Sequence, residues 1–450
     1  MAKLFGTDGI RGEAGRFPLD APTVRVIGNS LARHLAARLG HTPRFVIGRD
    51  TRESGAWIEA AFVAGATEAG AFCETAGVIT TPGVATLARI LPADAGIVLS
   101  ASHNPYHDNG IKIFTPTGRK LDEATERLIE ADIAAASANT SDTNGYQPDE
   151  ARAAALRAKY LLQLRLDAAK DLSLKGHKIV LDCANGAAAR LAPDLFASLG
   201  AAVIAINCAP DGQNINRDCG SLHLEGLQEK VKETGADLGV GFDGDADRSL
   251  FVDAQGAIVD GDATLWALAQ YLDARGELPD GLVVATVMSN IGLEIALRSR
   301  GWTLARTDVG DKYVLEELLN SGAGVGGEQS GHIMFPRLSL AGDGMMTALL
   351  LLQAMQATEK PLHELVSGFT RYPQTLVNVR VQEKKSFSDV PLIVSAKEKI
   401  EQELGDTGRL LLRYSGTEPL ARVMIEGAEQ KKIEAYAHEL AAVIGAALGK

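Results

Sequence analysis

The chain has few cysteines, and their spacing matches no disulfide or metal-binding pattern. They form no C-x-x-C pair, so neither a disulfide framework nor a zinc knuckle is indicated. We expect all of them to be buried free thiols. The four cysteines are Cys73, Cys183, Cys208 and Cys219.

Long apolar segments and excess positive charge are also absent. No basic stretch followed by an apolar run opens the chain, and the apolar run at residues 349–352 is far too short to span a bilayer. We therefore expect a cytoplasmic protein with no membrane partner. A formal net charge of −12 argues against nucleic acid as a partner, although local clusters of Arg and Lys can still bind small anionic phosphates.

A chain of 450 residues is too long for a single core and predicts three or four domains. Three segments share one order, in which a β-branched run is followed by a run that opens on glycine and by a run that ends in a polar loop. Because ligands bind at the carboxyl ends of strands in open α/β sheets, three such units can direct three loops at one cleft. The first runs begin at Arg44, His177 and Leu282, the second at Gly70, Gly200 and Gly301, and the third at Gly96, Leu238 and Gly324.

Polar stretches mark the ends of these units. Residues 135–149 are small and polar, which predicts a linker, and residues 252–259 have the pattern of a hairpin that leads into the third unit. After residues 368–373 the pattern changes to an α+β module of a different kind. The predicted domains are residues 1–149, 150–256, 257–368 and 369–450, and the last has expected strands at 376–381, 409–414 and 421–426 and helices at 391–404 and 431–448.

The loop that ends the second unit is acidic. Asp243, Asp245 and Asp247 alternate, and residues two apart in an extended segment face the same side, so three carboxylates can bind one hard cation. An EF-hand loop would need Gly and Glu where Arg248 and Ala254 stand, so Mg²⁺ is favoured over Ca²⁺. Without a cation, the three adjacent carboxylates would repel one another.

The loop that ends the first unit carries a candidate nucleophile. Ser102 follows an apolar run and has His103 and Lys112 nearby. A serine hydroxyl is a useful nucleophile only with a base or a metal beside it, and no G-x-S-x-G elbow suggests an esterase. Alone, Ser102 would fit a turn or a helix cap, but its place opposite a metal loop in a repeated unit favours a nucleophile.

The loop that ends the third unit offers polar contacts for a substrate. Residues 322–327 satisfy G-x-G-x-x-G, but a helix-like stretch precedes them, whereas a dinucleotide site requires a strand before and a helix after. Glu328, Ser330 and His332 supply a carboxylate, a hydroxyl and an imidazole, which suit sugar hydroxyls and proton transfer. A lone histidine such as His332 can equally be structural.

A fourth loop, in the last domain, gathers hydrogen-bond donors. Residues 413–419 join two predicted strands, and together with Arg422 they offer two guanidiniums, two hydroxyls and backbone amides exposed by glycine. These groups suit a phosphate. The expected phosphate ligands are Arg413, Ser415, Gly416, Thr417 and Arg422.

Together these motifs resemble those of the α-D-phosphohexomutases over essentially the whole chain. Residues 100–112 are similar to the phosphoserine loop of that family, 243–248 to its Mg²⁺ loop, 327–332 to its sugar-binding loop and 413–419 to its phosphate-binding loop. Residues 5–12 and 285–293 are similar to the glucosamine branch more than to the phosphomannomutases. Lys312 departs from that branch, where Arg is more usual, and a lysine loses the bidentate fork.

The resemblance implies three mixed α/β domains around a central cleft and a C-terminal α+β domain like that of the TATA-box-binding protein. It implies that phospho-Ser102 interconverts glucosamine 6-phosphate and glucosamine 1-phosphate through a sugar bisphosphate, on the route to UDP-N-acetylglucosamine and peptidoglycan. Mg²⁺ would be held by the Ser102 phosphate and the three aspartates, a sugar 1,6-bisphosphate would be the activator, and a homodimer is compatible with the family. His103 would lie beside Ser102, and Arg248 would share the charge of the transferring group with Lys112. His332, Lys112 or Arg11 would handle the hydroxyl proton, and the sequence leaves that choice open.

Two rival functions use some of the same residues. A phosphomannomutase or phosphoglucomutase would use the same machinery on another sugar phosphate. A phosphatase of the haloacid-dehalogenase type would use Asp243 as its nucleophile, but its motif requires Thr or Val where Asp247 stands. A non-enzymatic sugar-phosphate sensor is conceivable, yet no residue favours it.

Overall fold

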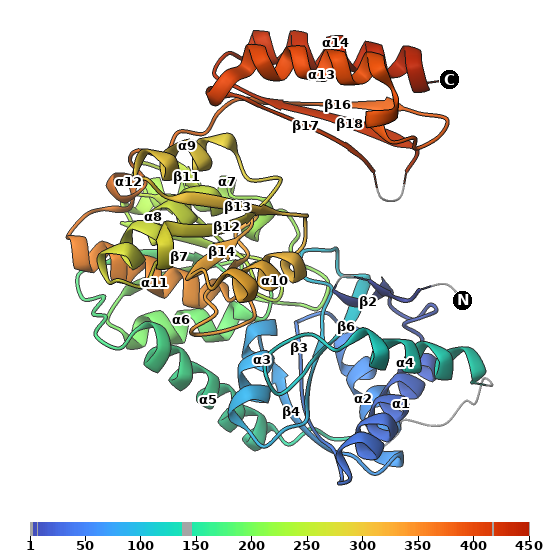
Figure 1. The fold of residues 1–450 in the computed structure, drawn as a ribbon. Coiled ribbons are helices and arrows are strands. Elements are labelled where there is room, and N and C mark those ends of the chain that lie inside the picture. Colours follow the sequence, from blue (N-terminus) through green and yellow to red (C-terminus); the bar gives the residue numbers. More distant parts are fainter. Residues whose placement is uncertain (1–2, 7, 137–145, 416–417, 450) are drawn as a thin grey trace.

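The computed structural model describes residues 3–6, 8–136, 146–415 and 418–449, and three of its sheets belong to the repeated segments (Figure 1). The first sheet has the order β1-β2-β6-β5-β3-β4, from β1 (Phe5–Gly6), β2 (Gly9–Glu13), β3 (Arg44–Arg49), β4 (Phe72–Val78), β5 (Ala95–Leu99) and β6 (Asp108–Phe114). The second has the order β11-β10-β9-β7-β8, from β7 (Lys178–Asp182), β8 (Ala202–Ile206), β9 (Leu238–Phe242), β10 (Ser249–Asp253) and β11 (Ile258–Val259). The third has the order β13-β12-β14-β15, from β12 (Leu282–Thr286), β13 (Thr303–Thr307), β14 (Val325–Gly327) and β15 (Ile333–Met334).

The three sheets share one topology. In each, the first strand of the repeated unit lies between the second and third strands and runs parallel to both. An antiparallel strand then pairs with the third strand. The loops that follow β5, β9 and β14 therefore leave equivalent positions of three similar sheets, which confirms the predicted repeat.

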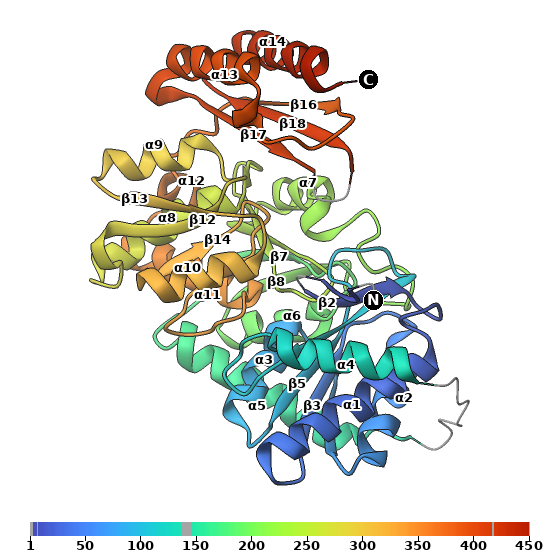
Figure 2. The same cartoon turned by 45° about the vertical axis from the view of Figure 1, so that its right-hand side comes forward.

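Helices cover these sheets (Figure 2). Helix α1 (Ala21–Leu39) shows how the sequence sets its ends, because Asp20 caps its first turn through the backbone N–H of Thr23 and Gly40 ends it with φ 74°. Within the described ranges, no helix is long and apolar enough to cross a membrane. The others are α2 (Gly55–Glu68), α3 (Thr81–Ile90), α4 (Glu123–Ala135), α5 (Glu150–Ala168), α6 (Ala188–Ser198), α7 (Glu225–Thr234), α8 (Gly261–Ala274), α9 (Ile291–Ser299), α10 (Asp311–Ser321), α11 (Gly344–Thr358) and α12 (Leu362–Leu365).

One hydrophobic core joins the first three units. It includes Val84 of α3, Phe196 of α6 and Leu349 of α11, so it does not stop at any boundary between them. The buried phenol of Tyr160 in α5 donates to Asp343 (2.8 Å) and accepts from Thr80 (3.2 Å). Because a close-packed core resists sliding, it keeps the three sheets in a constant arrangement.

The cysteines are only partly as expected. Cys183 and Cys219 are buried free thiols, but Cys73 is half-buried and Cys208 is exposed. The prediction for Cys208 was wrong because this residue lies in the loop after β8, outside the packed layers.

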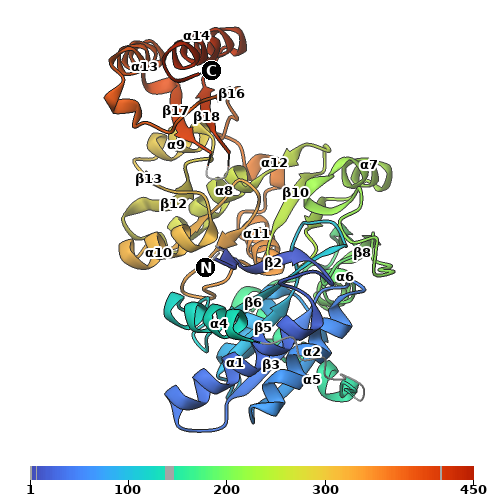
Figure 3. The same ribbon diagram turned by 90° about the vertical axis from the view of Figure 1, so that its right-hand side faces the viewer.

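The last unit is an antiparallel sheet with two helices on one face (Figure 3). Its elements are β16 (Gln374–Arg380), α13 (Pro391–Leu404), β17 (Arg409–Tyr414), β18 (Leu420–Glu426) and α14 (Gln430–Leu448), and the strand order is β16-β18-β17. The predicted elements are confirmed, with their ends moved by two residues or fewer. Buried Glu426 joins this sheet to the third unit, because it accepts from the Ile291 N–H at the start of α9 (3.1 Å) and pairs with Arg409 (2.8 Å).

Candidate active site

Ser102 lies in the loop between β5 and β6, in a strained backbone conformation. Its φ is +51°, a left-handed value that a residue other than glycine keeps only when its surroundings enforce it. Its N–H donates to the Ser100 hydroxyl (3.0 Å), and its carbonyl accepts from Asn216 (2.9 Å). The Ser102 hydroxyl donates to Asp243 at 2.6 Å, so the candidate nucleophile and the acidic loop meet directly.

A buried ion pair that the sequence analysis missed supports this loop. Arg52 and Asp50 are both almost fully buried, 2.9 Å apart. The Arg52 guanidinium donates to the carbonyls of Ser102 (3.0 Å) and Asn104 (2.8 Å), and Asp50 accepts from Ser100 (2.6 Å). The sequence offered one indication of this pair, because the polar residues Asp50-Thr-Arg52 directly follow a buried strand. Ligand-binding side chains are often found at that position.

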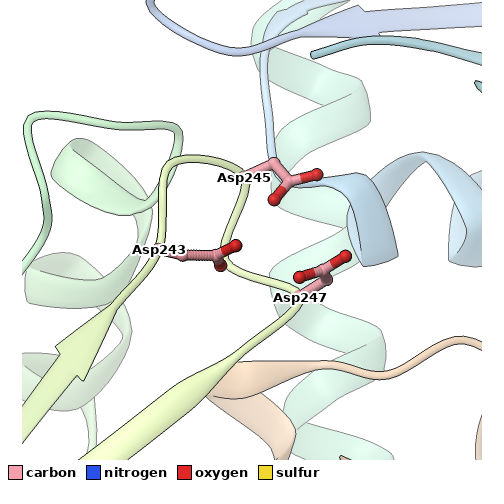
Figure 4. A group of neighbouring side chains, drawn as sticks. All are labelled: Asp243, Asp245 and Asp247. Atoms are coloured by element: carbon pink, nitrogen blue, oxygen red, sulfur yellow. The ribbon is translucent and has the colours of Figure 1, made fainter. Parts of the chain in front are cut away.

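The acidic loop between β9 and β10 brings its three carboxylates together (Figure 4). One ligand atom from each of Asp243, Asp245 and Asp247 lies within 4.8 Å of the others. The loop is not extended as expected, because Ala246 has φ 54° and the chain turns there. Gly244 lies against the Ser102 carbonyl, where an added Cβ would come within 2.6 Å of that oxygen.

The acidic loop has buried carboxylate oxygens without hydrogen-bond partners, and such oxygens suit a hard cation. One carboxylate oxygen of Asp245 and one of Asp247 are buried with no hydrogen-bond partner. Burial and the charges of Asp247 and Asp245 raise the pKa of Asp243 well above its usual value. Repelling, partly unsatisfied carboxylates in one buried space are the donor set that Mg²⁺ prefers.

Lys112 neutralises part of this charge. Its ammonium nitrogen lies 2.8 Å from Asp245, 3.0 Å from Asp8 and 3.5 Å from Asp247. Burial would lower the pKa of Lys112, but these three carboxylates outweigh it and raise the pKa well above its usual value. Lys112 is therefore a cation in this arrangement. Asp8 was not predicted as a site residue, although it lies in the opening motif.

His332 approaches the acidic loop from the third unit. Its Nδ1 lies 3.7 Å from Asp247 and its Nε2 lies 4.0 Å from Asp311. Burial would lower the pKa of His332, but its contact with Asp247 and the charges of Asp311 and Glu328 raise that pKa to about 9. The imidazole is therefore protonated near neutral pH.

His103 differs from His332 in charge. Burial and the nearby Arg248 and Arg11 lower the pKa of His103, so its ring is neutral at pH 7. Its Nδ1 lies 3.4 Å from the Ser102 hydroxyl. The two histidines thus differ in protonation because His332 contacts a carboxylate and His103 faces two guanidiniums.

The residues of the third loop that were predicted to bind the sugar are partly paired with one another. Glu328 accepts from the Gly310 N–H (3.1 Å) and from the Ser330 hydroxyl (3.2 Å). The glycines at 322–327 run from the end of α10 into β14, which confirms that they form no dinucleotide turn. A cavity of about 450 Å³ connects the loops of the three units, and its walls include Arg11, Ser102, Asp247, Arg248, Glu328 and His332.

The residues of the last unit that were predicted to bind phosphate do not line this cavity. Arg413 and Arg422 are cross-strand neighbours on β17 and β18, and Arg422 donates to the Ser415 hydroxyl at 3.5 Å. Gly416 and Thr417 lie outside the described residues. Among the residues that the structure describes, none from the last unit lines the 450 Å³ cavity.

The raised pKa of His332 predicts a pH-dependent contribution to stability. A group whose pKa rises on folding stabilises the folded protein fully below its unfolded pKa of 6.5, and this stability is lost as pH rises through about 9. In metal-free protein, the stability advantage of the parent over His332→Gln is expected to fall by on the order of 3 kcal/mol between about pH 6 and pH 9.5. Urea unfolding of both proteins in the presence of a chelator measures it. An advantage that does not change with pH would contradict the protonated state of His332.

A strained serine that donates to a carboxylate triad beside a sugar-sized cavity is the arrangement of a phosphoryl-transfer enzyme. Family models described as phosphoglucomutase/phosphomannomutase match the chain from end to end. They cover α/β/α domain I at residues 2–140, domain II at 158–256, domain III at 260–372 and the C-terminal domain at 376–443. The chain belongs to the phosphoglucomutase/phosphomannomutase family.

Comparison with curated relatives shows which members of this family the chain is similar to. Proteins named phosphoglucosamine mutase from Solibacter usitatus and Rhodococcus jostii are each 47% identical to it, and the aligned regions cover 100% and 99% of both chains, respectively. A solved phosphoglucomutase/phosphomannomutase family protein from Burkholderia thailandensis is 25% identical, with a TM-score of 0.80 over 99% of this chain and 97% of that one. An Aspergillus fumigatus N-acetylphosphoglucosamine mutase, solved with GlcNAc-6P and magnesium, shares the fold at 19% identity, with a TM-score of 0.64 over 98% of this chain and 95% of that one.

Proposed function

We propose that this protein interconverts glucosamine 6-phosphate and glucosamine 1-phosphate in the cytoplasm, and so supplies the synthesis of UDP-N-acetylglucosamine and peptidoglycan. The observation that carries the proposal is the 2.6 Å contact between the Ser102 hydroxyl and Asp243, at the wall of a cavity that three units share. The names of curated relatives at 43–47% identity support glucosamine phosphates as substrates.

Ser102 is the residue that carries the phosphoryl group in this proposal. The phosphoryl group passes from the Ser102 oxygen to a sugar hydroxyl, which gives a sugar bisphosphate, and the other phosphate of that bisphosphate then returns to Ser102. A sugar 1,6-bisphosphate would therefore also act as the activator that phosphorylates a bare Ser102. The protonated Lys112 and His332 and the guanidiniums of Arg248 and Arg11 stabilise the charge on the transferring group.

Mg²⁺ is the cation that we propose for the acidic loop. Asp243, Asp245 and Asp247 would hold it together with an oxygen of the Ser102 phosphate, and when bound it supplies neutralisation of phosphate charge. The protein's own part is to orient the three carboxylates. Lys112 and the Thr81 hydroxyl, which donates to Asp245 at 2.5 Å, do this for the middle aspartate.

The phosphatase rival is disfavoured by the surroundings of Asp243. An aspartate nucleophile must turn a carboxylate oxygen toward its substrate. Here one Asp243 oxygen accepts from the Ser102 hydroxyl and the other accepts from the Arg248 N–H. Asp243 is thus placed to orient the serine oxygen rather than to attack.

Turnover of purified protein on glucosamine, glucose and mannose 6-phosphates, measured side by side with Mg²⁺, tests the function. We expect the glucosamine compound to be converted most efficiently. Faster conversion of mannose or glucose 6-phosphate would support the phosphomannomutase or phosphoglucomutase alternative, and release of free phosphate without isomerisation would support the phosphatase.

In the proposal, the loop of the last unit holds the phosphate that is not reacting. One site must accept the sugar in two orientations, so a separate group of donors must hold whichever phosphate is not reacting. Arg413, Ser415 and Arg422 bear no feature that distinguishes a 1-phosphate from a 6-phosphate.

Replacement of Arg422 by Ala is expected to impair reaction from both monophosphates, mainly through substrate affinity. The expected loss is on the order of 1.5–3 kcal/mol in kcat/KM, the worth of a charge-assisted hydrogen bond. The mutant should also release more bisphosphate and depend more on added activator. Turnover in both directions, with and without that activator, measures these effects. Arg380, exposed on neighbouring β16, provides the control Arg380→Ala, and equal losses in the two variants would remove Arg422 from phosphate binding.

A further inference from the structure

Six side chains form a closed cycle of alternating charge, which we call the charge ring, and four of them line the cavity. Three acids and three bases alternate, and each unit that lines the cavity contributes at least one of them. Neighbouring atoms around the ring lie between 2.6 and 4.0 Å apart. In order, the members are Asp247, Lys112, Asp8, Lys120, Asp311 and His332, which closes on Asp247.

Lys120 is the member of the ring that joins the first unit to the third. Its ammonium nitrogen lies 2.7 Å from Asp8 and 2.6 Å from Asp311. Asp8 also pairs with Lys112 (3.0 Å) and with Arg11 (2.5 Å), so Lys120 is one carboxylate away from two proposed catalytic residues.

The backbone of Lys120 is well placed to hold this position. Lys120 forms a β-bridge with Phe114, and the turn between them is closed by a hydrogen bond from Thr115 N–H to the Arg119 carbonyl (2.7 Å). Lys112 and Lys120 therefore extend from the two arms of one hairpin toward the same carboxylate, Asp8. The hairpin sets the spacing of the two lysine backbones, and Asp8 pairs with both ammonium groups.

On the far side, Asp311 lies beside the loop that was predicted to bind the sugar. It is the first residue of α10, and the N–H of the preceding Gly310 donates to Glu328 at 3.1 Å. The Asp311 carboxylate also lies 4.0 Å from His332. A contact that fixes Asp311 thus fixes two members of the sugar-binding loop relative to the first unit.

We propose that Lys120 is a positioning residue that sets the sugar-binding loop of the third unit at its working distance from Ser102. This inference rests on the proposed function for its kinetic test. Lys120 pairs with Asp8 and Asp311, and it acts through these two carboxylates.

Lys120→Met removes the charge and keeps most of the side-chain volume. We expect kcat to fall by about 10–100-fold, while KM changes by less than about threefold, because a displacement of about 1 Å can cost this much in rate when binding groups remain. Lys120→Arg keeps the charge and should recover most of kcat. A Lys120→Met variant with the parent's kcat would overturn the proposal, as would a Lys120→Arg variant no better than Lys120→Met.

Lys312 offers a matched control at the same boundary. Its ammonium pairs with Glu123 at 3.1 Å, also between the third and first units, but both side chains are about half exposed. Exposed pairs contribute little, so Lys312→Met should change kcat by less than about twofold. A larger loss in Lys312→Met than in Lys120→Met would show that general attachment of the two units, and not the charge ring, sets the rate.

Asp311→Asn completes a double-mutant cycle and adds a structural measurement. If Lys120 acts through Asp311, the double variant should lose no more than the worse single variant, whereas fully additive losses would overturn the link. Hydrogen exchange gives a readout without substrate, since Lys120→Met, but not Lys312→Met, should speed exchange of the backbone around Gly310. If the parent protein is inactive on glucosamine phosphates, only the proposed function is contradicted. If hydrogen exchange around Gly310 is unchanged in Lys120→Met, only the role of Lys120 is contradicted.

Discussion

Replacement of Ser102 by Ala is expected to reduce mutase turnover by on the order of 10⁴-fold or more, with little change in fold. The reason is that Ser102 is the proposed covalent carrier, and removal of a nucleophile leaves only binding and charge stabilisation. The neighbouring Asp243 would lose the hydroxyl that donates to it at 2.6 Å, which costs about one hydrogen bond of stability. Turnover with added glucose 1,6-bisphosphate measures the effect, because this activator cannot phosphorylate an alanine.

Ser100→Ala is the matched control, since Ser100 is a buried serine two residues earlier that bonds to Asp50. It should weaken the loop but keep phosphate on Ser102. Intact mass and peptide mapping of the parent should locate one phosphoryl group on Ser102. A hydroxylamine-labile phosphate on Asp243 instead would support the phosphatase mechanism and contradict the mutase proposal.

Asp245→Asn is expected to lower turnover by on the order of 10²–10³-fold and to weaken Mg²⁺ binding. Fewer anionic ligands hold a hard cation less tightly, and the metal's charge stabilisation is worth several kcal/mol. The substitution also removes the 2.8 Å ion pair with Lys112, so the remaining carboxylates must share that ammonium.

Two measurements separate these effects. Activity across a Mg²⁺ titration reports the loss of turnover, and binding of Mn²⁺ followed by electron paramagnetic resonance reports metal affinity without any substrate. Asp273→Asn, an exposed carboxylate on α8, serves as the control and should change neither. Parent-like Mn²⁺ affinity in Asp245→Asn would remove this residue from the metal site.

Short-range patterns carried most of the site prediction. Ser102 and the three aspartates could be predicted as site residues because each motif directly follows an apolar strand, and position at a strand end is a local property of the chain. The repeat of three units could be predicted for the same reason. In the last unit, helices and strands followed from local periodicity, with ends displaced by two residues or fewer.

Contacts between residues far apart in the sequence could not be predicted from local patterns. Arg52 supports the Ser102 loop from 50 residues away, and Lys120 meets Asp311 across 191 residues. Nothing in the local sequence of either residue specifies its partner, because the partner's position depends on how whole sheets pack. The protonation of His332 belongs to the same group, since its pKa depends on contact with Asp247 in another unit.

The chain's own pattern thus determines which loops are predicted to carry the chemistry, because strand ends and residue types are local. Packing of the first three units decides their distances and charges, because the 2.6 Å contact of Ser102 with Asp243 joins residues 141 positions apart. The packing of the three units also gives the basic side chains of the site different partners. Lys112, Lys120 and His332 all look alike as isolated basic residues, and they acquire different partners only when three sheets share one core.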